Sequence, residues 1–157
     1  MKNKELITPI VEWSYEELDD TRRRLVDNAR LATERSYAPY SNFRVGAAIL
    51  LDNGEIVTGS NQENAAYPSG TCAERTAAFY AHASYPNAKF KAIAVAAKGT
   101  DGNEVSEPVS PCGACRQSLL EFETLAKESV EVILVGANFI YVLPSVKSTL
   151  PLAFSEF

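Results

Sequence analysis

Three cysteines are the residues of this chain whose types and spacing could do chemistry. Cys72 lies in the run TCAE, and Cys112 and Cys115 lie further along in the run PCGAC. A structural zinc site is usually closed by four protein ligands, whereas a catalytic site keeps three and leaves the fourth position for water. Three thiols with a carboxylate nearby, Glu74, therefore indicate a zinc site with a catalytic role.

Both cysteine motifs fall where helices are predicted to begin. The Ala-rich run over 71–84 predicts one helix, and Pro111 predicts the start of another over 112–127. Residues three apart on a helix are neighbours, with about 5–6 Å between Cβ atoms, which suits two thiolates on one metal ion. Helix N-termini also carry partial positive charge, which favours thiolate over thiol. Two helix ends could thus converge on one zinc ion.

Glu74 and His82 are the other candidates for the site on the first of these helices. Glu74 lies about 200° from Cys72 on an ideal helix, so both reach one pocket only if the helix end points into that pocket. The alternative is that Glu74 merely interacts with the helix dipole. His82 would lie about 15 Å from Cys72 along the axis, which makes it a poor fourth ligand.

The charge of the proposed site requires compensation. Zinc with three thiolates carries a net negative charge, which would hold the proton on bound water more tightly than neutral ligands would. Arg75 is the obvious donor to the cysteine sulfurs, and Arg116 could act in the same way. The alternative for Arg75 is an ordinary surface arginine.

The composition is that of one ordinary globular domain. The chain has 157 residues, of which 46% are hydrophobic and 22% charged. A net charge of −5 argues against nucleic acid as a partner. No apolar run is long enough for a membrane span, and the first residues lack the apolar core of a signal peptide. We therefore expect a cytoplasmic protein with reduced thiols, no nucleic-acid partner and no membrane partner.

The remaining pattern predicts a layered α/β protein. We expect an N-terminal extension over residues 1–13 and a single domain over 14–157. A capping box at Ser14–Glu17 predicts a helix over 14–36. Strands are expected over 43–51, 55–60, 90–97, 130–135 and 139–143, the first two joined by a hairpin turn, DNG. The order of elements predicts a three-layer α/β/α sandwich with a mixed five-stranded sheet.

Four blocks of sequence carry a resemblance to a known family. They read YAPYSNFRVGAA over 37–48, NQENAAYP over 61–68, CAERTA over 72–77 and SPCGACRQ over 110–117. Together they resemble the small homotetrameric zinc-dependent cytidine deaminases, and the likeness covers about residues 20 to 157. The first-ligand and PCxxC pattern is also the general signature of zinc deaminases.

The resemblance implies a reaction and the residues that perform it. Cys72, Cys112 and Cys115 would bind one Zn²⁺ per subunit, and Glu74 would shuttle protons from zinc-activated water to the base and the leaving amine. Cytidine and deoxycytidine would be hydrolysed to uridine and deoxyuridine with release of ammonia, in pyrimidine salvage.

The resemblance also implies substrate contacts and an assembly. The expected contacts are Asn61 and Glu63 to the ribose hydroxyl, Phe43 to the base, the backbone of Ala73 to the base, and Tyr67 and Phe154 reaching a neighbouring subunit's site in a homotetramer. Four of these residues have an alternative. Phe43 could be plain core, Asn61 and Glu63 could be turn residues, and Phe154 could pack only within its own subunit.

Other functions remain open at this stage. The PCGAC run is also typical of a redox dithiol, although that leaves Cys72 and Glu74 unexplained. A zinc-binding homologue without activity is a second alternative. A deaminase of nucleotides, polynucleotides or an antibiotic cytosine nucleoside is a third. Glu63 would repel a phosphate group, so a free nucleoside is favoured.

Overall fold

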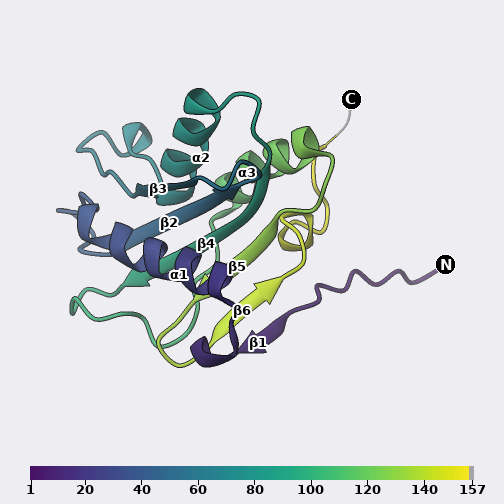
Figure 1. Ribbon diagram of the computed structural model, residues 1–157, viewed down its shortest axis with the longest axis horizontal. Helices are drawn as coiled ribbons and strands as arrows, with labels where there is room; N and C mark the ends of the chain where they lie inside the picture. The colour runs from purple at the N-terminus through teal and green to yellow at the C-terminus, as the bar shows by residue number, and fades with distance from the viewer. Residues whose placement is uncertain (156–157) are drawn as a thin grey trace.

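A single six-stranded sheet forms the centre of the molecule. The computed structural model describes residues 1–155 (Figure 1). The strands lie in the order β1-β6-β5-β4-β2-β3. Their bounds are β1 Val11–Trp13, β2 Arg44–Leu51, β3 Ile56–Ser60, β4 Phe90–Lys98, β5 Glu131–Val135 and β6 Ile140–Leu143. β4 and β5 are parallel and the other neighbouring pairs are antiparallel, so the sheet is mixed, as expected.

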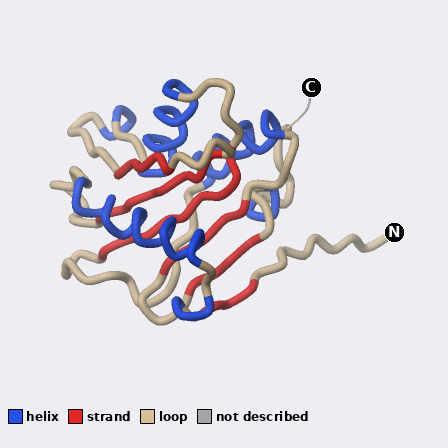
Figure 2. Tube along the Cα trace, viewed as in Figure 1, coloured by secondary structure: helices blue, strands red, loops and turns tan. Residues whose placement is uncertain are grey.

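Helices cover both faces of this sheet. They are α1 Asp20–Ala32, α2 Ala73–Ser84 and α3 Gly113–Ala126, with short 3₁₀ turns at η1 Tyr15–Glu17, η2 Thr33–Arg35, η3 Tyr67–Ser69 and η4 Lys147–Thr149. Figure 2 shows α1 crossing one face, with α2 and α3 on the far side of the strands. The predicted three-layer α/β/α sandwich is confirmed.

The alternation of side chains along β4 separates the two cores. Ala94 and its neighbours of the same parity pack with α1, while Ile93 and Val95 pack with α2 and α3. Small alanines on the α1 face let that helix approach closely. The bulkier residues fill the space under the two helices that carry the cysteines. The two helices that begin at the cysteine motifs, α2 and α3, are therefore packed on the same side of the sheet.

Two glycines let the helices lie close to the strands. A Cβ on Gly46 would stand 2.2 Å from the Ala29 carbonyl oxygen of α1, and a Cβ on Gly59 would stand 2.4 Å from the Ala77 amide nitrogen of α2. Real Cβ atoms do not approach backbone this closely. Gly59 therefore allows α2 to lie close to β3. Cys72 and Glu74 lie at the start of this helix.

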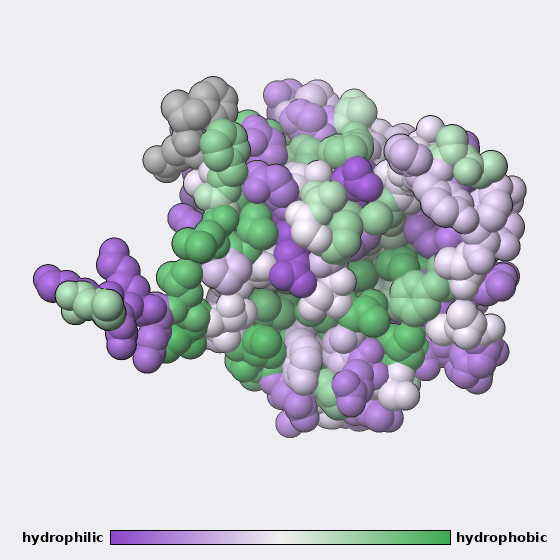
Figure 3. All heavy atoms as spheres, turned by 180° about the vertical axis from the view of Figure 1, so that it is seen from behind, coloured by the Kyte–Doolittle hydropathy of each residue, from purple (hydrophilic) through white to green (hydrophobic). Residues whose placement is uncertain are grey.

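The sheet has six strands, so the expected five is wrong. The additional strand is β1, which pairs antiparallel with β6 through Val11–Val142 and Trp13–Ile140. It lies within the segment expected as an N-terminal extension. The residues before it form an exposed arm, and the Thr8 hydroxyl donates to the Ser148 carbonyl at 2.9 Å. Figure 3 shows apolar side chains gathered where this arm meets the body.

The predicted helix over 14–36 is interrupted. The capping box of Ser14 and Glu17 is present, but it caps only η1. Leu18 then adopts an extended conformation, and the Asp19 side chain caps α1 by accepting from the Arg22 amide at 2.9 Å. The other helices and strands begin and end within two residues of their predicted bounds. Within residues 1–155, none of the helices has the length and apolar character that crossing a bilayer requires.

Candidate metal centre and adjoining cleft

The three cysteines meet where two helices begin. Cys72 is the N-cap of α2, Cys112 is the N-cap of α3, and Cys115 lies in the first turn of α3. Their sulfur atoms all lie within 4.8 Å of one another, and those of Cys72 and Cys112 are 3.9 Å apart. The predicted convergence of two helix N-termini on one point is confirmed.

This sulfur geometry fits a zinc ion. Four ligands at the corners of a tetrahedron, with Zn–S bonds of about 2.3 Å, place the sulfurs about 3.8 Å apart. The Cys72–Cys112 separation of 3.9 Å matches that spacing, and the other two sulfur pairs lie within 4.8 Å. Three thiolates leave one corner of the tetrahedron for a non-protein ligand. His82 lies at the other end of α2, with its ring 5.5 Å from that of Phe122, away from the sulfurs.

The pKa values of the Cys72 and Cys115 thiols are shifted in opposite directions. Hydrogen bonding from Cys115, together with Arg75 and Cys112, lowers the pKa of Cys72 to about 5. The hydrogen bond to Cys72 and burial raise the pKa of Cys115. Without metal, one thiolate is thus stabilised by its neighbours and the buried thiol keeps its proton. A metal ion takes all three as thiolates, so binding releases protons.

Glu74 is buried beside the sulfurs. It is the second residue of α2, and only 4% of it is exposed. Burial raises its pKa, and the negative charge of Cys72 adds to the effect. Because Cys72 is the cap rather than a helical residue, the 200° separation of an ideal helix does not apply. The helix end points both side chains toward one site.

Arg75 donates to a metal-ligand sulfur. Its Nη2 lies 3.8 Å from the Cys72 sulfur, and the cysteine contacts raise its pKa. Its Nε is buried and has no hydrogen-bond partner among the described residues. A cation held against the thiolate offsets part of the negative charge of the metal site. The expected contact of Arg75 is present at the Cys72 sulfur, and its role in balancing the charge of the site stays a prediction.

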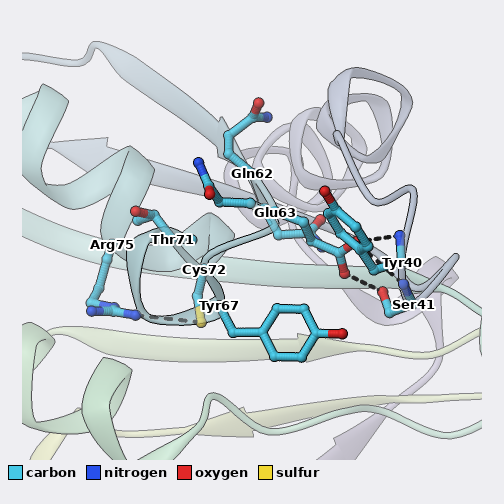
Figure 4. Close-up of a pocket in the computed structure, with 11 residues that line it drawn as sticks. Tyr40, Ser41, Gln62, Glu63, Tyr67, Thr71, Cys72 and Arg75 are labelled. Atoms are coloured by element: carbon cyan, nitrogen blue, oxygen red, sulfur yellow. Dashed lines mark hydrogen bonds between the residues drawn. The ribbon is translucent and has the colours of Figure 1, made fainter.

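A cleft of about 530 Å³ opens next to Cys72. Figure 4 shows its labelled side chains around a common space, with Arg75 turned toward Cys72 and Tyr67 lying alongside. The residues that line it are Tyr40, Ser41, Asn61, Gln62, Glu63, Asn64, Tyr67, Gly70, Thr71, Cys72 and Arg75. This volume is typical of small-molecule sites.

Asn61 and Glu63 hold the wall of the cleft. The Asn61 amide donates to the Phe43 carbonyl at 2.9 Å, and its oxygen accepts from the Val45 amide at 2.8 Å and from the Ser36 hydroxyl. The Glu63 carboxylate accepts from the Tyr40 amide at 2.8 Å, and the Ser41 hydroxyl also donates to it. The Ser41 contact contributes most to lowering the pKa of Glu63.

The other predicted contact residues lie at different depths. Phe43 is half-buried just before β2, and Ala73 is fully buried at the start of α2. Tyr67 is 77% exposed, with its ring 6.0 Å from that of Tyr40. Phe154 is 70% exposed, and its carbonyl accepts from the Gln117 side chain at 2.8 Å. Of these four, Tyr67 lines the cleft.

Tyr40 and Ser41 also line the cleft, and sequence reasoning did not identify them as site residues. A signal was available, since these polar residues lie in the first family-like block, just before Asn42 and Phe43. The hypothesis that Arg116 also contacts the sulfurs differs from the observed contacts. Its guanidinium donates to the carbonyl groups of Pro111 and Thr149.

Comparison with known families bears on the same residues. Residues 19–130 match the family described as the cytidine and deoxycytidylate deaminase zinc-binding region. This match includes all three cysteines and Glu74.

Individual relatives extend the likeness along the chain. The cytidine deaminase of Sporosarcina psychrophila is 44% identical over 133 residues, which cover 85% of this chain and 90% of that protein. The cytidine deaminase of Halalkalibacterium halodurans is 46% identical over 100 residues, covering 64% of this chain and 70% of the relative.

Solved structures agree with these relatives. The crystal structure of cytidine deaminase from Burkholderia pseudomallei is 40% identical and aligns with a TM-score of 0.69, covering 83% of this chain and 97% of that chain. The structure of the Mycobacterium tuberculosis cytidine deaminase aligns with a TM-score of 0.69 at 32% identity, covering 88% of this chain and all of that one, 100%.

Proposed function

The chain belongs to the cytidine deaminase family, and on that premise we propose that it hydrolyses cytidine and deoxycytidine to uridine and deoxyuridine with release of ammonia. The observation that carries the proposal is the cluster of three cysteine sulfurs within 4.8 Å at two helix N-termini, with the buried Glu74 two residues after Cys72. Three protein ligands and an adjacent carboxyl are the donor set of a hydrolytic zinc site.

Cys72, Cys112 and Cys115 would hold the zinc ion, which when bound supplies a water molecule of lowered pKa as nucleophile. Arg75, donating to the Cys72 sulfur, offsets the negative charge that three thiolates bring to the site. The two helix N-termini add partial positive charge at the same point. Together these positive charges offset the negative charge that would otherwise hold the proton on the bound water more tightly.

Glu74 moves the protons in this proposal. Its carboxylate oxygen accepts one proton from water as the water oxygen bonds to the amino-bearing carbon, and passes that proton to the ring nitrogen of the base. It then takes the second proton from the hydroxyl group now on that carbon and delivers it to the leaving amine. The amino group departs as ammonia and the water oxygen remains on the base, so atoms balance. Burial, which raises the pKa of Glu74, makes the carboxyl better able to hold the proton between these steps.

The cleft beside Cys72 suits a free nucleoside. Asn61 and Glu63 supply a donor and an acceptor at its wall, which is what a ribose hydroxyl requires. The Glu63 carboxylate would repel a phosphate, and the Arg75 guanidinium that lines the cleft is directed at a sulfur. Phe43 and the Ala73 backbone are proposed to contact the base.

We further propose a homotetramer in which neighbouring subunits complete each other's sites. Tyr67 and Phe154 are aromatic and mostly exposed, and Phe79 and Tyr80 on α2 are at least half exposed, at 51% and 64%. Aromatic side chains in such positions are typical of interfaces. Sedimentation should give a tetramer, and a fully active monomer would contradict the shared site. The reaction is proposed to take place in the cytoplasm, where thiols stay reduced.

The test of substrate class compares a nucleoside with its nucleotide. Zinc-loaded protein is incubated with cytidine, deoxycytidine or cytidine 5′-monophosphate, and conversion of the cytosine base to uracil is followed by ultraviolet absorbance together with ammonia release. We expect both nucleosides to be turned over, with kcat/KM for the nucleotide lower by about a hundredfold or more, since phosphate is placed near a carboxylate without a cationic clamp. A preference for the nucleotide would contradict the proposal.

A further inference from the structure

Arg116 joins two segments that are far apart in the sequence. It lies one residue after Cys115 and is half-buried. Its Nε donates to the Pro111 carbonyl at 2.8 Å, and its Nη1 donates to the Thr149 carbonyl at 2.9 Å. Pro111 directly precedes the metal ligand Cys112, and Thr149 ends η4. The Arg116 guanidinium thus bridges the segment just before α3 and the C-terminal part of the chain.

The same helix holds the C-terminal part at further points. Near its end, the Glu123 carboxylate accepts from the Val146 amide at 2.7 Å and from the Lys147 amide at 3.1 Å. Near its start, the Gln117 amide donates to the Phe154 carbonyl at 2.8 Å. Side chains of α3 therefore form hydrogen bonds with the backbone at several points between residues 146 and 154.

Packing reinforces this arrangement. Leu150 and Ala153 pack against the core under α2 and α3. The amides of Thr149 and Leu150 donate to the carbonyls of Val146 and Lys147 at 2.9 and 3.1 Å, which closes η4. The segment is ordered by the side chains of α3 as well as by its own turn. Side-chain contacts thus join the start of α3 to the segment that carries Phe154.

The two arginines next to metal ligands have different roles. Arg75 places its charge against the Cys72 sulfur, whereas the hydrogen bonds of Arg116 go to backbone carbonyl groups. A planar guanidinium presents donors in a fixed fork, so it can satisfy two carbonyls at once. Lysine has a single ammonium group on a flexible stem and cannot span both with the same geometry.

We propose that Arg116 is a positioning residue that couples the loop bearing Cys112 to the C-terminal segment, so that metal site and segment are held in one fixed arrangement. The role of Phe154 in binding substrate rests on the proposed function, but the coupling itself does not. The experiment therefore uses two readouts that need no turnover.

The first readout is hydrogen exchange at the Thr149 and Leu150 amides, and the second is zinc affinity measured by competition with a chelator. Arg116→Met removes both hydrogen bonds. We expect exchange at these amides to speed up about tenfold, as for the loss of one hydrogen bond to a charged donor. Zinc affinity should fall by about tenfold or more, the usual effect of removing a group that supports a metal ligand.

Matched variants separate coupling from general damage. Arg24→Met, at an exposed arginine of α1, should change neither readout. Gln117→Met should speed exchange only beyond Leu150 and leave zinc affinity unchanged. Arg116→Lys should restore at most one of the two readouts, and it replaces Arg116→Met if that protein does not fold.

The proposal is overturned if Arg116→Met leaves exchange at Thr149 and Leu150 within twofold of wild type, or if it changes exchange without changing zinc affinity. Phe154→Ala distinguishes this result from a failure of the proposed function. If Phe154→Ala leaves KM for cytidine unchanged while Arg116→Met alters both readouts, Phe154 does not bind substrate and the coupling still stands.

Discussion

Replacing Glu74 with glutamine isolates proton transfer from every other property of the site. The substitution keeps the size of the side chain and removes its ability to accept and return a proton. Glu74 is 4% exposed, so buffer cannot readily take over its role. General acid–base transfer by a positioned group contributes about 10²–10⁴-fold in rate. Because this one carboxyl serves the water, the ring nitrogen and the amine, we expect the upper end, about 10⁴-fold or ~5.4 kcal/mol of activation free energy.

The fold and the metal site should survive this change. Burial raises the pKa of Glu74 in the metal-free protein, which means that the folded state disfavours its charged form. A neutral amide relieves this cost, so the thermal midpoint should not fall by more than a few degrees. The cysteine ligands are untouched, and zinc content should equal that of wild type.

The assay follows the absorbance change of cytidine with zinc content and thermal unfolding measured on the same samples. Glu121→Gln, an exposed glutamate on α3, is the matched control and should retain wild-type turnover. Turnover by Glu74→Gln within tenfold of wild type, in protein with full zinc, would refute the role of Glu74. Loss of zinc together with activity would instead show that Glu74 supports the metal.

Three further predictions address the ligands, the helix position and the cap. Cys112→Ala should lose zinc and turnover together, as metal analysis and the cytidine assay will show, and a zinc-replete active variant would contradict ligation. Gly59→Ala should destabilise the fold by roughly 3 kcal/mol in urea unfolding, because its Cβ would meet the Ala77 amide at 2.4 Å; an unchanged midpoint would contradict the close approach. Asp19→Ala should cost about 1 kcal/mol at neutral pH. The Arg22 amide lowers the pKa of Asp19, so this stability is present above the pKa of the unfolded chain and is lost as pH falls through the lower folded pKa. Urea midpoints of the two proteins should therefore converge in acid, and a constant difference would refute the cap.

The parts of the fold that could be predicted are those encoded locally. The DNG turn and the proline before Cys112 each determine a conformation from neighbouring residues alone. The strand β1 could not be predicted in this way, because three residues carry little pattern and become a strand only by pairing with β6. The break at Leu18 was also missed, since Asp19 offers a second cap directly after the first capping box.

The features of the site likewise divide into those encoded by neighbouring residues and those that depend on the tertiary structure. The spacing of the cysteines predicts that they form one metal site, because each of them lies at or near the N-terminus of α2 or α3. The hydrogen-bond partners of Asn61 could not be predicted. Its side-chain amide forms hydrogen bonds with the backbone of Phe43 and Val45, and these depend on how two strands and a loop meet. Arg116 shows the same limit. Its position next to Cys115 in the sequence suggested a contact with the cysteine sulfurs, whereas in the fold its guanidinium donates to the Thr149 carbonyl.

The central claim is that three cysteines of this chain hold the zinc ion on which cytidine hydrolysis depends. The most direct measurement is a titration of metal-stripped protein with zinc, with bound metal and the rate of uridine formation recorded at each step. The rate should rise in proportion to bound zinc and stop rising at one zinc per chain. Full activity in the stripped protein, or no uridine formed once the three-cysteine site is filled, would contradict the claim.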